Sequence, residues 1–173
     1  MKIEQLKRIF EFLEEKGEHN APFLWKWKNN IPLTEEDLNI KSNLDLRGSK
    51  ITSLPEGLYV GGYLSLKNSE ITSLPEGLEV GGYISLQNTK ITSLPKGLKV
   101  GGNLELSFSK IISLPEGFKI GGSLDLSYSD IKSLPKGLKV GKNLYIGKEL
   151  LKYLDNELRE MVKPGFIKGE IIR

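Results

Sequence analysis

The segment LSLKNSEITSLPEGLEVGGY, residues 64–83, is followed directly by ISLQNTKITSLPKGLKVGGN, residues 84–103. The same 20-residue pattern, with leucine, isoleucine, proline and glycine at fixed places, extends over most of the chain. A short fixed period is the sequence signature of a solenoid, in which each unit buries its apolar residues by stacking on its neighbours. The repeat therefore predicts the fold.

Each unit contains the parts of one coil. A Leu-x-Leu pair predicts a short strand that points two side chains inward and the residue between them outward. The proline after a later leucine, from Pro55 to Pro135, cannot donate to a strand ladder and predicts an extended return segment. Glycine pairs such as Gly61-Gly62 predict turns. Stacked coils of this kind place their strands in one parallel sheet.

The array begins near Leu38 and ends near Glu157, which gives six units over residues 38–157. The last unit is degenerate, because Tyr153-Leu154-Asp155 replaces the Ser-Leu-Pro corner. Terminal coils would expose their core, so residues 1–37 and 149–173 are predicted to form caps. The expected fold class is an α/β solenoid with a parallel sheet on its concave face and a helical cap at each end.

Three segments carry the cap predictions. Residues 3–16 space their apolar side chains as an amphipathic helix, which caps the array or binds a partner. Trp25-Lys26-Trp27 is interpreted as cover for the first coil, with partner contact or stacking on nucleic-acid bases as alternatives. Residues 149–163 predict a C-terminal helix, and residues 166–173 a final strand or a hairpin around Gly169.

The unit from Leu64 to Leu78 resembles the short bacterial type of leucine-rich repeat, in the Val-Gly-Gly variety found in tailed phages and prophages. The resemblance implies a protein-binding role, as a phage- or prophage-type intracellular inhibitor or adaptor of a host protein, a CRISPR effector being one case. A departure from the family is a hydroxyl residue where asparagine usually stands. Hydroxyls satisfy fewer backbone groups than amides, so a thinner ladder between coils is expected at two columns. These columns are Ser49, Ser69, Thr89, Ser109 and Ser129, and Ser53, Ser73, Ser93, Ser113 and Ser133.

Composition excludes several kinds of chemistry. The chain has no cysteine and one histidine, His19, so thiolate catalysis and Cys/His metal clusters are excluded, and no cofactor or metal is expected. Glu105 and Asp125 are the one suggestive carboxylate pair, but an open strand face offers no pocket, so no enzyme activity is expected. No apolar run is long enough to span a membrane and no signal peptide is evident, which predicts a cytoplasmic location.

The candidate site lies in the outward columns, which vary from unit to unit while the core columns stay fixed. Tyr63 with Tyr83, and Phe108 with Tyr128, are predicted to stack one coil apart, and aromatic residues of this kind anchor protein interfaces. A net charge of only +3 and a mixed-sign face favour a protein partner over nucleic acid. The predicted binding residues are Asp45, Arg47, Tyr63, Lys67, Tyr83, Gln87, Asn103, Glu105, Phe108, Asp125, Tyr128 and Tyr145.

Two alternative functions remain open. A structural or virion component would dock its solenoid on other copies, and self-association is not decided by the sequence. An RNA-binding inhibitor would use the lysine column, defined as Lys99, Lys119 and Lys139, with Lys96 and Lys136 beside it. The same column is interpreted alternatively as a solubilising stripe.

Overall fold

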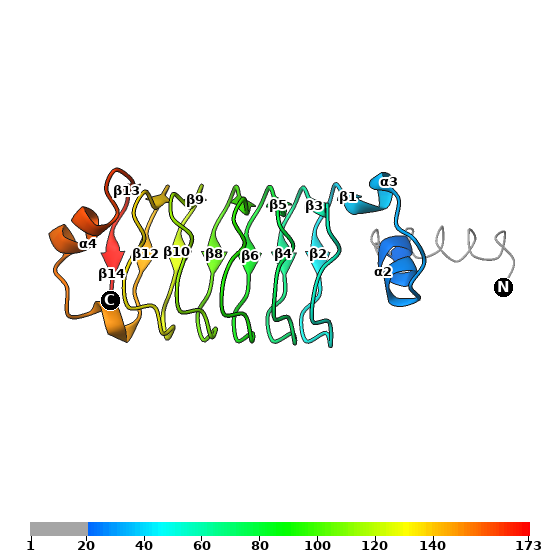
Figure 1. Ribbon diagram of the computed structural model, residues 1–173, viewed down its shortest axis with the longest axis horizontal. Coiled ribbons are helices and arrows are strands. Elements are labelled where there is room, and N and C mark those ends of the chain that lie inside the picture. Colours follow the sequence, from blue (N-terminus) through cyan, green and yellow to red (C-terminus); the bar gives the residue numbers. More distant parts are fainter. Residues whose placement is uncertain (1–20) are drawn as a thin grey trace, which may run out of the picture.

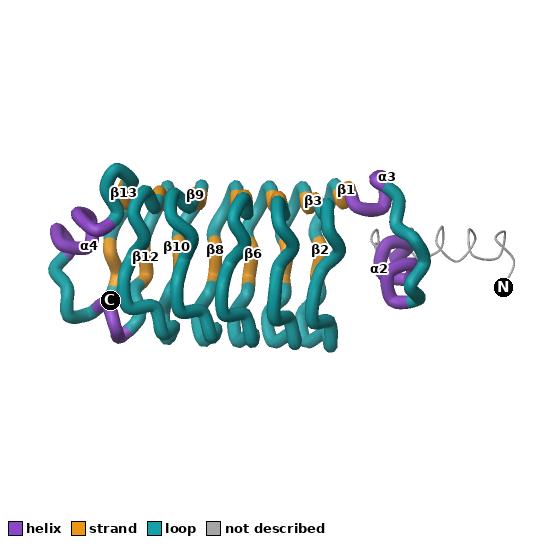
Figure 2. The backbone as a smooth tube through the Cα atoms, in the orientation of Figure 1, coloured by secondary structure: helices purple, strands orange, loops and turns teal. Residues whose placement is uncertain are grey.

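The computed structural model describes residues 21–173, which wind into a parallel β-solenoid with two sheets along its length (Figures 1 and 2). Each sheet has seven two-residue strands. Sheet A comprises β1 (Asn39–Ile40), β3 (Tyr59–Val60), β5 (Glu79–Val80), β7 (Lys99–Val100), β9 (Lys119–Ile120), β11 (Lys139–Val140) and β13 (Phe166–Ile167). Sheet B comprises β2 (Leu44–Asp45), β4 (Leu64–Ser65), β6 (Ile84–Ser85), β8 (Leu104–Glu105), β10 (Leu124–Asp125), β12 (Leu144–Tyr145) and β14 (Ile171–Ile172).

The sequence period is the structural period. Leu64 on β4 pairs in register with Ile84 on β6, twenty positions later. The Leu64 amide donates to the Tyr83 carbonyl at 2.9 Å, and the Leu66 amide donates to the Ser85 carbonyl at 2.8 Å. The predicted stack of 20-residue units with parallel strands is therefore confirmed.

The apolar columns form one continuous core along the array. In the unit that starts at residue 64, Leu64, Leu66 and Ile71 are each 0% exposed. Their equivalents in the following units are buried as well, so every coil packs on the coil before and after it. This is how a unit that cannot bury its own apolar face becomes stable.

Sheet A differs from the expectation of a single sheet and an extended return segment. Its strands come from the residue pair just before each glycine turn, such as Glu79–Val80, where the second residue is buried and the first is not. Two residues carry too little alternation to be distinguished from a turn in the sequence. Helices are confined to the two ends of the described residues, so the class is a β-solenoid rather than α/β.

Backbone packs directly on backbone at the glycine turns. A Cβ added to Gly121 would lie 2.1 Å from the Gly101 carbonyl oxygen, and one added to Gly101 would lie 2.2 Å from that of Gly81. A side chain at either position would overlap the preceding coil. Glycine therefore recurs there because of this close approach.

Among the described residues, the helices α2 (Ala21–Lys28) and α3 (Glu35–Leu38) precede the array. Phe23 is buried in the core cluster and stacks on Trp27, with ring centroids 5.6 Å apart. The Lys26 ammonium lies 2.6 Å from the Asp37 carboxylate, which also accepts from the Thr34 amide at 2.8 Å. Lys26 is thus paired with a carboxylate of the protein itself. The helix predicted over residues 3–16 lies outside the described residues.

The C-terminal end departs most from the sequence prediction. The continuous helix expected over residues 149–163 is wrong, because a 3₁₀ turn at Lys148–Leu150 and α4 (Asp155–Met161) are separated by extended backbone at Leu154. The Leu154 amide donates to the Glu157 carboxylate at 2.6 Å, which starts α4 anew at this point.

The last eight residues form strands of both sheets. β13 pairs in parallel with β11 in sheet A, and β14 pairs in parallel with β12 in sheet B, so a hairpin around Gly169 is wrong. The Gly169 amide donates to the Lys142 carbonyl at 3.0 Å, and the chain turns there from one sheet to the other. The chain therefore ends in a further coil of the array.

The expected hydroxyl ladders between coils are not formed. Three hydroxyls of the first column bond within their own coil, and the Ser49 and Ser69 hydroxyls have no hydrogen-bond partner among the described residues. The Thr89, Ser109 and Ser129 hydroxyls donate to the carbonyl three residues earlier, at 2.8, 2.6 and 2.7 Å. Their short side chains reach that carbonyl more readily than the next coil. The column from Ser53 to Ser133 is exposed. Asparagine side chains bridge coils instead, as where the Asn103 side-chain oxygen Oδ1 accepts from the Ser123 backbone amide at 2.9 Å.

Candidate protein-binding face

The outer side of sheet B carries the predicted binding residues, and it is called the binding face below. They lie on the strands of sheet B or directly beside them. All of them are exposed or half-buried. The structure thus brings the predicted residues onto one surface of the array, with one set of positions contributed by each coil.

Two aromatic stacks stand on the binding face. The Tyr63 and Tyr83 rings, the tyrosine pair, are stacked with centroids 4.9 Å apart and an interplanar angle of 12°. The Phe108 and Tyr128 rings, the aromatic pair, are stacked at 4.4 Å and 9°. Both predicted stacks are confirmed. The tyrosine pair precedes its strands and the aromatic pair follows its strands, so the two lie at opposite strand ends and on different coils.

The aromatic pair has a backbone conformation that the sequence analysis did not anticipate. Phe108 and Tyr128 have φ angles of 57° and 56°, in the left-handed region. The equivalent residues of earlier coils are Gly48, Asn68 and Asn88, whose φ angles are 65°, 59° and 52°. Glycine and asparagine adopt this region readily, whereas bulky side chains rarely do. The column of residues after the strand was the available signal, because it changes from Gly and Asn to aromatic residues.

Two opposing energies act on the aromatic pair: backbone strain destabilises it and ring stacking stabilises it. Left-handed backbone costs about 1–2 kcal/mol per residue for an ordinary side chain, and a stacked aromatic pair returns about 0.5–1.5 kcal/mol. The backbone is held there by its neighbours, since the Phe108 amide donates to the Ser127 carbonyl at 3.2 Å. Despite the stack, Phe108 stays 55% exposed and Tyr128 72% exposed. The coil thus tolerates strain to display two apolar rings to solvent.

Charge is separated along the binding face. Near its N-terminal end, Arg47 forms an ion pair with Asp45 at 2.7 Å. The hydrogen bond from the Arg47 side chain lowers the pKa of Asp45, and the Asp45 carboxylate in turn raises the pKa of Arg47. Farther along, Glu105 and Asp125 are half-buried and stand in register on β8 and β10. The aromatic pair therefore follows directly after the acidic strand positions.

The centre of the binding face is less accessible than the Leu-x-Leu alternation predicts. Ser65 and Ser85, expected to point into solvent, are each only 4% exposed. The Ser85 hydroxyl has no hydrogen-bond partner among the described residues. Burial raises the pKa of the neighbouring Tyr83, and the nearby Tyr63 and Glu105 raise it further, so Tyr83 presents a neutral phenol. Ser65 and Ser85 are therefore covered by the larger side chains around them on the binding face.

The described residues offer little other chemistry. Across residues 21–173 no three His, Cys, Asp or Glu side chains gather as a metal site requires. Over the same range, the helices are too short or too polar to cross a lipid bilayer. No protein-family model, curated protein or solved structure matches this chain. The assignment of the repeat to a family therefore rests on the residues of the repeat itself.

Proposed function

We propose that this chain is a leucine-rich-repeat solenoid that binds a protein partner through the binding face and performs no catalysis. One observation carries the proposal. Phe108 and Tyr128 are stacked, exposed to solvent and held in left-handed backbone where glycine or asparagine would be relaxed. Backbone strain at an exposed position is a feature of functional sites. Rigid aromatic side chains are also the residues most often found as interface anchors.

The repeat supports the family part of the proposal. Each coil presents buried leucines at the Leu-x-Leu strand, a buried isoleucine and a buried leucine before proline, which is the order of the short bacterial type. The second sheet and the within-coil hydroxyl bonds are local variations on that plan. On this assignment, sheet B is the concave sheet of the family, and the binding face is its usual recognition surface.

The charges beside the aromatic pair favour one kind of partner. Glu105 and Asp125 lie on the strands that lead into Phe108 and Tyr128. A phosphate backbone would meet these carboxylates and be repelled. A protein that brings an arginine or lysine would pair with a carboxylate and stack its aliphatic stem or guanidinium on a ring. The expected partner is therefore a bacterial host protein with a basic residue at the centre of its contact surface.

The decisive experiment compares capture by three forms of the full chain. Wild type, the double variant Phe108→Asn/Tyr128→Asn and the control Tyr59→Asn are immobilised and exposed to bacterial lysate with and without nuclease. Tyr59 is 38% exposed on sheet A, so the control removes an exposed aromatic ring away from the binding face. We expect a nuclease-resistant protein that wild type and Tyr59→Asn retain and the double variant loses.

The affinity of the captured protein then gives the size of the effect. Loss of two aromatic anchors should weaken binding by at least about 2 kcal/mol, or roughly thirtyfold. Replacing Tyr63 and Tyr83 with alanine tests the other end of the face and should weaken binding with little change in melting temperature. Unchanged affinity in a folded Phe108→Asn/Tyr128→Asn variant would refute the proposal, as would capture of nucleic acid alone.

A further inference from the structure

The outer side of sheet A carries the lysine column on three adjacent strands. Lys119 and Lys139 stand in register on β9 and β11, and Lys99 precedes them on β7. Neighbouring strands are about 4.8 Å apart, so the three ammonium groups extend from a line only ~10 Å long. Like charges directly opposite one another on paired strands are destabilising. The fold does not require them, because earlier coils carry Asn39, Tyr59 and Glu79 in this column.

The contact of Lys99, the first lysine of the column, shows that a carboxylate can bind there. The Lys99 ammonium forms an ion pair with the Glu79 carboxylate of the preceding coil. Lys119 has no carboxylate partner among the described residues, and the Lys139 ammonium lies 5.8 Å from the centre of the Phe166 ring. The column thus begins with a carboxylate that the protein supplies and continues with two lysines that it does not neutralise.

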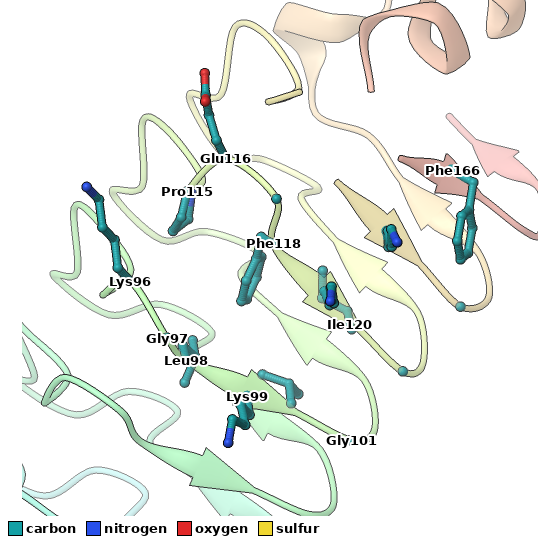
Figure 3. A pocket seen from close by; sticks show the side chains of 16 residues that line it. Lys96, Gly97, Leu98, Lys99, Gly101, Pro115, Glu116, Phe118, Ile120 and Phe166 are labelled. Atoms are coloured by element: carbon teal, nitrogen blue, oxygen red, sulfur yellow. The ribbon is translucent and has the colours of Figure 1, made fainter. Parts of the chain in front are cut away.

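A groove with apolar walls runs beside the column. Its volume is about 1020 Å³, and its lining includes Pro115, Phe118 and Phe166 besides the three lysines. Figure 3 shows Lys96 and Lys99 toward one end, Phe118 between, and Phe166 at the other end. Phe166 is 48% exposed, so an apolar side chain of a ligand can pack on it. The site therefore combines cations at strand spacing with an apolar end.

We propose that this groove binds an acidic, extended peptide segment of a partner protein, whose carboxylates continue the column that Glu79 begins. An extended peptide rises ~3.3 Å per residue, so about four residues cover the column and place two carboxylates over Lys119 and Lys139. Long, flexible lysine stems accommodate the difference in spacing. A phosphate backbone fits less well, because the groove ends on the exposed Phe166 ring, which an apolar side chain of a peptide covers and a phosphate does not.

The test uses a fluorescein-labelled peptide in which glutamate alternates with serine and one end is leucine, followed by fluorescence anisotropy at low salt. Two surface ion pairs together supply about tenfold in affinity, so Lys119→Gln/Lys139→Gln should weaken binding by about that factor. The matched control is Lys90→Gln/Lys110→Gln, which removes the same charge from exposed positions outside the groove. It should bind within a factor of about two of wild type.

Further measurements with the same assay decide the inference. A glutamine version of the peptide should not bind, and Phe108→Asn/Tyr128→Asn should bind the glutamate peptide as wild type does, which separates this site from the binding face. No saturable binding by wild type, or equal weakening by both lysine variants, would overturn the proposal. Tighter binding of a single-stranded oligonucleotide than of the peptide would assign the groove to nucleic acid instead.

Discussion

The two halves of the array share a core and differ on both faces. In the N-terminal half, residues 39–98, the left-handed position is Gly48, Asn68 or Asn88, and the outward residues of sheet A are Asn39, Tyr59 and Glu79. In the C-terminal half, residues 99–172, aromatic residues take the left-handed position twice and lysine occupies sheet A three times. The buried columns change hardly at all between the halves.

This difference distinguishes residues that stabilise a coil from residues that the coil displays on its surface without gaining stability from them. Asn68 and Asn88 are relaxed in left-handed backbone, and the Asn88 amide also donates to the Asn68 side-chain carbonyl at 2.9 Å. Phe108 and Tyr128 give up that hydrogen bond and accept strain. The N-terminal half is therefore the reference against which the C-terminal surfaces can be tested.

The largest expected effect tests whether the core is the same in both halves. Leu86 and Leu126 are both 0% exposed at equivalent positions. Leu86→Ala and Leu126→Ala should each lower the free energy of unfolding by about 2–5 kcal/mol, through lost burial and the cavity left behind. Urea unfolding measures both. If the two losses of unfolding free energy differ by more than the width of that range, the cores of the two halves are not equivalent. The same conclusion follows if Leu86→Ala has almost no effect on stability.

The next largest expected effect is a change in stability that has opposite signs in two variants. It tests the column of residues with left-handed backbone, which are Gly48, Asn68, Asn88, Phe108 and Tyr128. Asn68→Phe puts a bulky residue into relaxed left-handed backbone and should lower the free energy of unfolding by about 1–2 kcal/mol. Phe108→Asn/Tyr128→Asn relieves strain and restores the asparagine pair, so it should leave stability unchanged or raise it by up to about 1 kcal/mol. Thermal unfolding of the two variants checks the signs. A strongly destabilised double variant would mean that the aromatic pair serves the fold.

The smallest expected effect is on the pH dependence of the free energy of unfolding. It is tested by comparing two aspartates that occupy the same column of sheet B. Asp45 and Asp125 each accept from the amide two residues later, at 3.1 and 2.8 Å, but only Asp45 has an arginine partner. The pKa of Asp45 is lowered from 3.8 in the folded protein, so its stabilisation is present at neutral pH and is lost as pH falls through that lowered pKa.

Asp45→Asn should therefore reduce stability at pH 7 by at most ~0.5 kcal/mol, because the pair is solvent-exposed, and by less at about pH 2, where more of the carboxyl is protonated. Urea unfolding at both pH values measures the difference. Asp125→Asn is the matched control, because it replaces an aspartate of the same column that has no arginine partner. An equal change for both aspartates would show that Arg47 is not its cause.

The period predicts most of the fold, because a residue repeated at every coil has the same surroundings at every coil. Leu64, Ile71 and Leu74 could be placed in the core by that argument alone, and both aromatic stacks follow from it. Where the period fails, prediction failed as well. The last unit is degenerate and residues 158–173 lack the repeat. The apolar spacing of residues 149–173 fits a helix as well as it fits the coil that the chain forms.

That the candidate residues share one face could be predicted, whereas their conformation and burial could not, and their role in binding stays a prediction. The sequence indicates which side chains share a face, whereas the sign of φ at Phe108 and the burial of Ser85 depend on the assembled coils. The groove on sheet A could not be foreseen, since sheet A itself was not. The cytoplasmic setting, the phage-type origin and the non-catalytic role stay predictions.

The glycine turns make the array adjustable in length. At Gly61, Gly81, Gly101, Gly121 and Gly141 an added Cβ would fall 2.1–2.6 Å from the carbonyl oxygen of the coil before, so the coils meet at this turn through main chain alone. A duplicated or deleted unit of twenty residues then meets the same backbone contact at this turn on either side. Gene duplication would therefore shift the aromatic pair and the lysine column along the solenoid axis by a whole number of coils.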